Sequence, residues 1–470
     1  MNFTNSNLYL LFASFSPDEL KELHKVLHSP FFNYREEEIR LYSYLLKIRK
    51  TKTTIPSTDE ICRHVFPKQK PDIVKLRHVM SYLLRIMNRY IAISELENTE
   101  DLKRLLLLRS QRRRDLSKSF VTNYKETSHY YDEEAKLSPD LYYYQFQLHT
   151  EYYTHSITNR RTPNEELRRL TEDLDSFYAI QKLKQLCSVL SYRNIFKDGK
   201  SDEMAQDVIE LIEKKGLKDN PLVSLLYQNY LCLLEPQNEA HFVRLKELLL
   251  TRSDRIETRE LKDIFTLAIN YCIKQLNSGV QGYYDEVFDI YEAGLERGVF
   301  EENNKLSAFT YKNISAIAIG LKKHDWVKGF LEQYRPKLDE EVRDGFYAYC
   351  MARYYFAVGE YATVSQLLQQ VDIKEQFTDL DARVLLIKTY YELDEYDLLD
   401  YSIGNLKQQL KRKKLQSYHQ SVYGNFVKSL SKLMHLRPYD KKAKSEYILK
   451  LKEIKAVAEK EWLLAKVKEK

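Results

Sequence analysis

Two stretches in the C-terminal third of the chain, YFAVGEYATVSQLL at residues 355–368 and YYELDEYDLLDYSI at residues 390–403, decide the fold. An offset of 35 residues aligns the apolar pattern Tyr355, Tyr361, Val364 and Leu368 of the first stretch with Tyr390, Tyr396, Leu399 and Ile403 of the second. A third, weaker copy begins another 35 residues upstream, at Gly320. Within each copy the apolar residues recur at helical spacing around a short turn, so the pattern predicts a repeated helix-turn-helix unit.

The composition favours helices along the whole chain. Only 12 glycines and 11 prolines occur among 470 residues, too few for the many tight turns of a β-sandwich or barrel. With 43% hydrophobic and 30% charged residues, the chain has the composition of a soluble globular protein. The 37 tyrosines favour thin layers of paired helices, because tyrosine can bury its ring while its hydroxyl stays hydrated. We therefore predict an all-α protein with no sheet.

The repeated unit resembles the tetratricopeptide repeat (TPR), a helix pair with small and aromatic residues where its helices touch. Ala352, Tyr355, Gly359 and Tyr361 match the family's small, aromatic, glycine and aromatic positions. The second copy departs from the family, since Asp394 stands where glycine is usual. The resemblance covers residues 310–406 in detail and implies a right-handed α-solenoid of stacked helix pairs with a concave groove.

The same resemblance implies a set of first-helix positions that face the groove. They are Tyr311 and Lys322, Tyr349 and Arg353, and Lys388, Tyr391 and Glu392. Three cations and three tyrosines in one groove would suit a protein or peptide partner with an acidic or carboxylate-ended segment. In the alternative interpretation, the long cations shield apolar surface and the tyrosines fill the layer between helices.

Helix-capping and turn-forming residues along the chain predict four segments. Residues 1–97 form an N-terminal helical domain, residues 98–138 a charged helical connector, residues 139–435 the TPR-like solenoid, and residues 436–470 a C-terminal capping helix. In the first segment, Ser16 is predicted to cap one helix and Ser57 or Thr58 another, and Pro71-Asp72 is predicted to open a long one.

The chain as a whole also resembles a group of helical proteins from Bacteroidota-type bacteria. The motifs that carry this resemblance are Ser29-Pro30-Phe31-Phe32-Asn33, Val65-Phe66-Pro67 and Leu76-Arg77-x2-Met80-Ser81-x-Leu83. It implies no particular activity.

A basic segment supports nucleic-acid binding as an alternative function. Seven basic residues and one acid lie between Lys103 and Lys118, and the candidate contacts are Arg109, Arg112, Arg113 and Arg114. The stretch from Ser57 to Ile91 resembles the helix-turn-helix half of bacterial activators that join a winged helix to a TPR-like domain. No wing hairpin follows it, because residues 88–99 continue as a helix.

No sequence motif for catalysis, cofactor binding or metal binding is present. Nucleotide-binding glycine loops, nucleophile elbows and zinc-protease motifs do not occur. His24 and His28 have the spacing of two metal ligands on one helix but no third ligand nearby. We therefore assign no catalytic, cofactor or metal residues, although folding could bring together an active site without a motif.

The expected location is cytoplasmic. Five dispersed cysteines without a C-x-x-C pair favour buried free thiols in a reducing compartment. No basic residue precedes the apolar run from Leu8 to Phe15, so it makes a poor signal peptide, and no run is long enough to span a membrane. The favoured function is a non-enzymatic interaction scaffold or adaptor; nucleic-acid binding and an enzyme without a motif are the alternatives.

Overall fold

The structure is a computed structural model that describes residues 3–51, 57–67, 69–159, 164–196, 204–277, 279–280, 282–370, 372–412, 417–437 and 439–470. Within these ranges it contains 23 α-helices, three short 3-10 helices and one two-stranded hairpin. The predicted all-α class is therefore confirmed for the described part of the chain. All five cysteines are free and buried. None of the described helices combines the length and the apolar character needed to cross a membrane.

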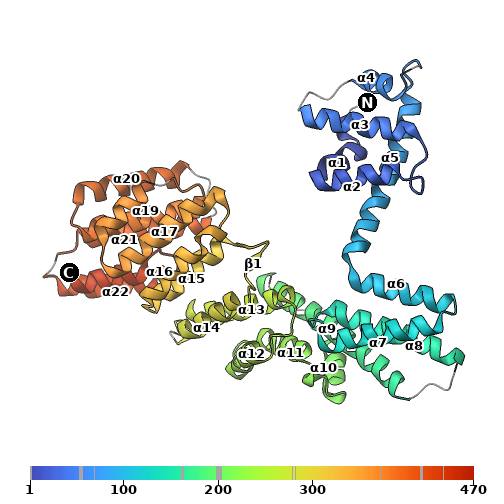
Figure 1. The fold of residues 1–470 in the computed structure, drawn as a ribbon. Coiled ribbons are helices and arrows are strands. Elements are labelled where there is room, and N and C mark those ends of the chain that lie inside the picture. The colour runs from blue at the N-terminus through green and yellow to red at the C-terminus, as the bar shows by residue number, and fades with distance from the viewer. Residues whose placement is uncertain are drawn as a thin grey trace. The chain divides into compact units, whose positions relative to one another are not determined.

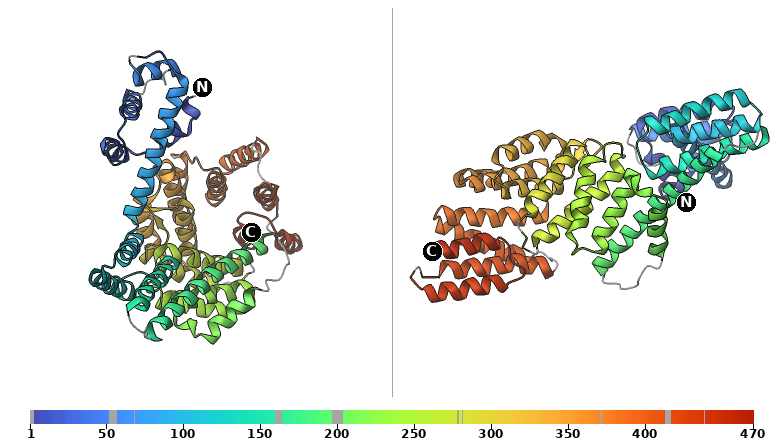
Figure 2. Two further views of the ribbon diagram at one scale, coloured as in Figure 1. Left: turned by 90° about the vertical axis from the view of Figure 1, so that its right-hand side faces the viewer. Right: turned by 90° about the horizontal axis from the view of Figure 1, so that it is seen from below.

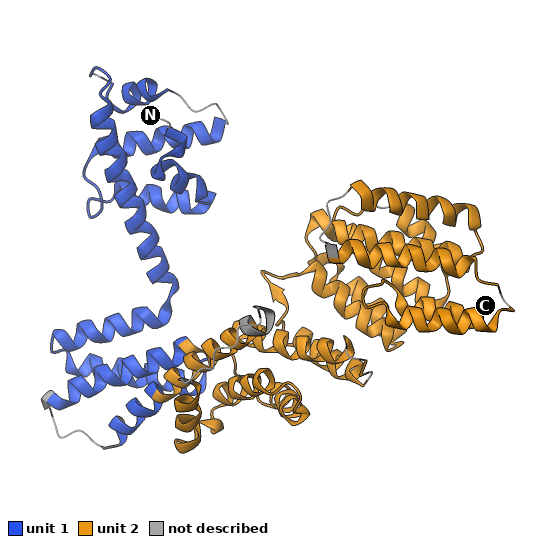
Figure 3. Cartoon of the chain, turned by 180° about the vertical axis from the view of Figure 1, so that it is seen from behind, with its two compact units in different colours: residues 1–135, 140–174 blue, residues 136–139, 175–470 orange. Residues whose placement is uncertain are grey.

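Packing divides the chain into two compact units (Figure 3). Unit 1 comprises residues 1–135 and 140–174, and unit 2 comprises residues 136–139 and 175–470. The division falls inside one long helix, α9 (Asn164–Phe196), whereas the sequence-based segments change at residues 97, 138 and 435.

The N-terminal block of unit 1 consists of five helices with well-defined starts (Figure 1). After a 3-10 turn at Phe3–Asn5 come α1 (Asn7–Ser14), α2 (Pro17–His28), α3 (Glu36–Thr51), α4 (Thr58–Val65) and α5 (Ile73–Asn98). Ser16 and Ser57 each form a capping box, and the Asp72 carboxylate accepts hydrogen bonds from the first turn of α5. The predicted starts at Ser16 and Asp72 are confirmed, and of the two alternatives for the third start Ser57 is the capping residue.

The rest of unit 1 is formed by α6 (Glu100–Arg113), α7 (Ser117–Glu133), α8 (Pro139–Asn159) and the beginning of α9. Helices α6 and α7 pack against each other across a tight turn at Asp115, whose φ is 56°.

Unit 2 begins with the remainder of α9 and continues as successive helix pairs. These are α10 (Met204–Lys214), a 3-10 turn at Leu217–Asp219, α11 (Pro221–Leu234), α12 (Glu239–Thr251), α13 (Thr258–Asn277) and α14 (Tyr283–Glu296). Helix α11 packs against α12 and α13 against α14, while α11 also contacts α13.

A short hairpin interrupts the helices, so the prediction of no sheet is wrong here. Strands β1 (Glu301–Glu302) and β2 (Lys305–Leu306) pair antiparallel around Asn303 and Asn304. Both asparagines have positive φ, 53° and 60°, as a two-residue hairpin turn requires. Strands of two residues are too short to show alternating polarity in the sequence.

The C-terminal half of unit 2 continues the same construction. It contains α15 (Ala308–Gly320), α16 (His324–Tyr334), a 3-10 turn at Arg335–Lys337, α17 (Glu340–Val358), α18 (Tyr361–Gln369), α19 (Gln376–Glu392), α20 (Tyr396–Arg412), α21 (Ser417–Met434), α22 (Lys441–Glu453) and α23 (Lys460–Glu469). Each odd-numbered helix from α15 to α19 pairs with the helix after it, and α17 contacts both α15 and α19. Figure 2 shows α19 to α23 lying side by side.

The turns inside the three C-terminal pairs correct the repeat alignment. Each turn contains one residue with positive φ: Lys322 (58°), Gly359 (86°) and Asp394 (58°). The last two are 35 residues apart, as aligned from the sequence, but the first two are 37 apart. The first copy is therefore misaligned by two residues in the sequence analysis.

The buried positions agree with the corrected register. In every pair the second helix starts two residues after the positive-φ residue, and its fourth residue is fully buried. These fourth residues are Val327, Val364 and Leu399. In this register Lys312 of α15, rather than Tyr311, is the counterpart of Tyr349.

Two helices, not a single capping helix, occupy residues 436–470. The break between α22 and α23 ends at Glu459, whose φ is 51°. Leu463, Leu464 and Val467 of α23 are buried in one apolar cluster with residues of α19, α20, α21 and α22. Helix α23 is therefore an integral part of the packing of unit 2.

Candidate functional site

Two of the seven predicted groove residues lie elsewhere. Tyr311 is 0% exposed, and its hydroxyl donates to the Leu331 carbonyl oxygen of α16 at 2.8 Å. It fills the layer between α15 and α16, as the alternative interpretation proposed. Lys322 is exposed in the turn that joins these helices.

Three of the remaining predicted residues surround Trp462 of α23. The Trp462 ring lies 5.3 Å from the Tyr391 ring and 5.5 Å from Lys388 Nζ, and its Nε1 donates to Glu392 Oε1 at 2.7 Å. Lys466, one turn further along α23, forms an ion pair with Glu392 at 2.8 Å. The positions expected to receive a partner thus receive the chain's own C-terminal segment.

Lys388 itself is only 5% exposed, and its ammonium group meets a carboxylate of this same segment. Its Nζ lies 2.7 Å from Glu459 Oε2 and 4.3 Å from the centre of the Phe356 ring. Burial acts to raise the pKa of Glu459, but the positive charges of Lys388 and Arg353 outweigh burial and lower it. Burial also acts on Lys388 and lowers its pKa, against the opposing attraction of Glu459.

Tyr349 and Arg353 occupy the next inner positions, on α17. Tyr349 is buried, and the guanidinium of Arg353 lies 6.0 Å from its ring centre. Within the described residues, Arg353 has neither an ion pair within 4.0 Å nor a side-chain hydrogen bond. Glu459 and Asp381 act on it from a longer range and, with Tyr349, raise its pKa against the opposing effect of burial.

Lys312 of α15 completes this arrangement and was missed in the sequence analysis. Its Nζ forms an ion pair with Asp381 Oδ2 at 3.1 Å, and the Tyr423 hydroxyl donates to Asp381 Oδ1 at 2.8 Å. The corrected repeat register would have found it, because that register pairs Lys312 with Tyr349. We call Lys312, Arg353 and Lys388, on α15, α17 and α19, the inner cation row.

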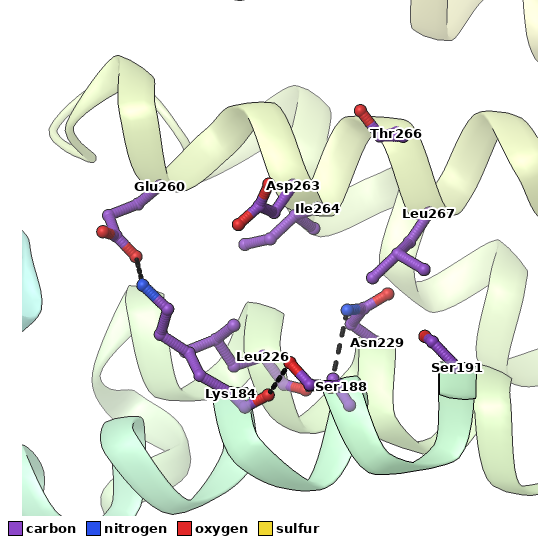
Figure 4. A pocket seen from close by; sticks show the side chains of 11 residues that line it. Lys184, Ser188, Ser191, Leu226, Asn229, Glu260, Asp263, Ile264, Thr266 and Leu267 are labelled. Atoms are coloured by element: carbon purple, nitrogen blue, oxygen red, sulfur yellow. Dashed lines mark hydrogen bonds and ion pairs between the residues drawn. The ribbon is translucent and has the colours of Figure 1, made fainter. Parts of the chain in front are cut away.

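A cavity of about 300 Å³ lies between α9, α11 and α13 (Figure 4). The ion pair of Lys184 with Glu260, at 2.6 Å, stands at one end, and Ser191 and Leu267 lie toward the other. Apolar side chains from α11 and α13 form much of the wall, while polar groups line its rim. The rim includes Ser188, Asp263 and Thr266.

A second cavity of about 260 Å³ adjoins the first along α11 and α13. The two share Asn229 and Leu267. Its further lining comes from Cys232, Leu233, Pro236, Leu245, Asn270, Tyr271 and Lys274. We call the two cavities together the α9–α13 strip; no motif in the sequence pointed to it.

A buried thiol and a buried amide line the α9–α13 strip. Burial raises the pKa of Cys187, which lines the first cavity, to about 12, so its thiol is protonated and weakly nucleophilic at neutral pH. Asn229 is buried, and its side-chain NH2 contacts the Cys187 sulfur at 3.6 Å, a weak hydrogen bond. An amide with such a weak acceptor can donate a better hydrogen bond to a ligand carbonyl.

The predicted nucleic-acid contacts divide into two pairs. Arg109 Nε and Arg112 Nε each lie 2.7 Å from an oxygen of the buried Glu151 carboxylate. Arg113 and Arg114 are exposed, and Arg114 also contacts the Ser110 hydroxyl. Half of the set thus forms internal ion pairs of unit 1.

Metal ligands do not gather in the part of the chain that the structure describes. No group of three or more His, Cys, Asp or Glu side chains there could hold an ion. The His24 and His28 rings lie 4.2 Å apart, and His28 Nδ1 is 2.8 Å from the His24 carbonyl oxygen.

Comparisons with protein-family models, curated proteins and solved structures gave no match to this chain. The resemblances to tetratricopeptide repeats and to helical proteins of Bacteroidota-type bacteria remain expectations from the sequence.

Proposed function

We propose that the protein is a non-enzymatic interaction scaffold whose unit 2 is a TPR-like α-solenoid. The contacts of unit 2 support this proposal, because α17 packs on α15 and α19 while each of these helices also packs on its own pair partner. The single observation that carries the function is the α9–α13 strip, two adjoining cavities on consecutive helices of one such array.

An extended polypeptide is the ligand that best fits the α9–α13 strip. Leu226, Ile264 and Leu267 offer apolar contact for side chains, while Asn229 and the exposed Asn270 offer amides for backbone groups. Two shallow cavities in line can accept successive side chains of one extended segment. The rim carries both charge signs, so it favours no strongly acidic or basic partner.

Selection from a random-peptide phage library on the immobilised full chain tests the proposal. We expect binders to emerge, and we expect Thr266→Arg to abolish their binding, because the exposed Thr266 stands on the rim and arginine would reach across the cavity. The matched control is Val243→Arg, since Val243 is 62% exposed on α12 and lines neither cavity.

Both variants should melt like the unaltered protein, since exposed substitutions usually change stability by no more than about 0.5 kcal/mol. Binders that survive Thr266→Arg, or that are lost equally in Val243→Arg, would place the interaction elsewhere and refute the assignment to the strip.

Nucleic-acid binding remains a second proposal, supported by the exposure of Arg113 and Arg114. If these residues grip phosphates, Arg113→Glu combined with Arg114→Glu should remove a gel shift that weakens as salt rises. A shift that persists in the double variant would exclude this segment as the contact.

A further inference from the structure

A third cavity, of about 540 Å³, lies between α14 and α16 of unit 2. These are the second helices of two successive pairs, α13 with α14 and α15 with α16. The cavity shares no lining residue with the α9–α13 strip, and no member of the inner cation row lines it. It is therefore a separate feature of unit 2.

Aromatic rings form one wall of this cavity. Trp326, Phe330 and Tyr334 recur at every fourth position of α16, so they lie along one face of the helix. The Trp326 and Phe330 rings are stacked with their centres 5.2 Å apart, and the Phe330 and Tyr334 centres are 5.0 Å apart. Phe330 and Tyr334 are buried, whereas Trp326 is partly exposed. The wall thus offers an accessible indole held in place by its neighbours, and aromatic rings of this kind attract cations.

Two carboxylates of α14 line the same cavity. Glu292 and Glu296 are four residues apart and therefore lie on one face of α14. Glu292 Oε1 accepts a hydrogen bond from Trp326 Nε1 at 3.1 Å, which fixes the carboxylate against the aromatic wall. Among the described residues, no lysine or arginine nitrogen lies within 4.0 Å of either carboxylate. The cavity thus combines two negative charges with aromatic surface.

The lysines that contact neighbouring rings have other partners. Lys337 lies 4.9 Å from the centre of the Tyr334 ring, and its ammonium group pairs with Glu301 at 2.5 Å. Lys323 Nζ lies 4.2 Å from the centre of the Phe288 ring. Neither lysine lines the cavity. The chain therefore places no cation of its own between the two carboxylates and the indole.

We propose that this cavity binds the guanidinium group of an arginine side chain carried by a partner polypeptide. A guanidinium is planar, and its N–H donors can pair with a carboxylate through two hydrogen bonds while its face stacks on an aromatic ring. A lysine ammonium is more strongly hydrated and has no face to stack, so it suits this combination less well. The site goes beyond the proposed function, and it would remain if the α9–α13 strip bound nothing.

Gly329 leaves the cavity accessible from the side of α16. It lies inside the helix, lines the cavity and is exposed. A Cβ atom added to it would meet no heavy atom within 4 Å. A larger side chain at this position is therefore compatible with the helix and would occupy the space that we assign to the guanidinium.

Fluorescence titration of the full chain with a capped Gly-Arg-Gly peptide tests the proposal. A Trp462→Phe background leaves Trp326 as the reporter. The same peptide with citrulline in place of arginine has nearly the same shape but no charge, and we expect it to bind about tenfold more weakly. A lysine peptide should also bind more weakly than the arginine peptide. Equal affinities for arginine and citrulline would overturn the proposal, and equal affinities for arginine and lysine would refute the guanidinium assignment.

Removal of the two charges is the second arm. Glu292→Gln combined with Glu296→Gln should weaken arginine binding by about tenfold or more, while the new amide oxygen can still accept from Trp326. The matched control is Glu340→Gln combined with Glu341→Gln, which removes two exposed acids of α17 that do not line the cavity. Unchanged affinity in the first variant, or an equal loss in the control, would overturn the proposal.

Filling the cavity is the third arm and does not alter any charge. Gly329→Leu should abolish binding of the arginine peptide, whereas Gly404→Leu, at an exposed position of α20, should leave it unchanged. Both variants should melt no lower than the unaltered chain, because leucine favours a helix interior more than glycine does. Retained binding in a folded Gly329→Leu variant would place the arginine elsewhere and refute the assignment to this cavity.

Discussion

Both halves of unit 2 consist of paired helices, but the first half leaves cavities open between its helices and the second half is covered by a later segment of the chain. In the first half, α9, α11 and α13 leave two adjoining cavities between them. In the second half, the inner positions of α19 meet Glu459, which directly precedes α23, and Trp462 and Lys466 of α23. The pairing of successive helices therefore does not determine which surface is open; in the second half a later segment of the same chain decides it.

The ion pairs of the two halves differ in the solvent exposure of the lysine. At the α9–α13 strip, the Lys184 side chain keeps 34% of its exposure, so this cation can hydrate if Glu260 is lost. In the inner cation row, the Lys388 side chain keeps only 7%, and it depends on Glu459 for compensation. We therefore expect the same chemical change to have different costs in the two halves.

The largest effect should come from loosening α23 itself. Leu463 is fully buried in the cluster shared with α19 to α22, so Leu463→Ala should lower the free energy of unfolding by about 3 kcal/mol. Leu449→Ala is the control, because Leu449 is 62% exposed on α22. Urea denaturation of both variants would show whether α23 is firmly packed, and equal losses would contradict the packing described for it.

Removing the carboxylate from the buried pair should come next. Glu459→Gln leaves the Lys388 ammonium buried without its counter-charge, and we expect a loss of about 2 kcal/mol in urea denaturation. Adding Lys388→Met to the same chain should recover most of this loss. Failure to recover it would show that Glu459 acts through something other than Lys388.

Acid should reproduce part of that effect. The pKa of Glu459 is lowered by Lys388 and Arg353 from its ordinary value of 4.5, so its contribution to stability is complete above pH 4.5 and is lost as the pH falls through the lowered pKa. The fluorescence of Trp462, followed in a Trp326→Phe background, should report the loosening of α23. In Glu459→Gln this part of the acid response should be absent, and an unchanged response would assign it to other carboxyl groups.

The smallest effect should be found at the open half. Glu260→Gln removes the partner of Lys184, but the lysine can turn toward water, so the loss should not exceed about 1 kcal/mol. Measured beside Glu459→Gln, it tests the contrast between the halves directly. Equal losses in the two variants would remove the distinction that we draw.

Much of the fold was predictable because its signals are local. The capping boxes at Ser16 and Ser57 and the spacing from Gly359 to Asp394 depend on residues close together in the chain. The register of the first C-terminal pair was not predictable from the sequence. Its turn places Lys322 in the left-handed region of φ, a conformation for which glycine is the usual sequence signal. The hairpin at Asn303 and Asn304 escaped because its strands have two residues each.

Only one of the two surfaces that meet at the candidate site was predictable from the sequence. Lys388, Tyr391 and Glu392 do share a surface with one another, but the residues that cover them lie about 70 positions away on α23. The period and spacing of residues along a helix show which residues share one face. They contain no information on which segment packs against that face. The α9–α13 strip is likewise assembled from three helices without a common motif.

The buried tyrosines whose hydroxyls bond to neighbouring helices should react more slowly than exposed tyrosines with reagents that attack phenolate. Tyr42 and Tyr311 are fully buried, and their hydroxyls donate to the Leu20 and Leu331 carbonyl oxygens. Burial raises the pKa of Tyr42 to about 12, so its reactive anion is scarce as well as shielded. Nitration or iodination under native conditions should mark tyrosines such as Tyr439, which is 94% exposed, and leave the layer tyrosines untouched until the helices separate. The pattern of modified tyrosines therefore shows which packed helices have separated.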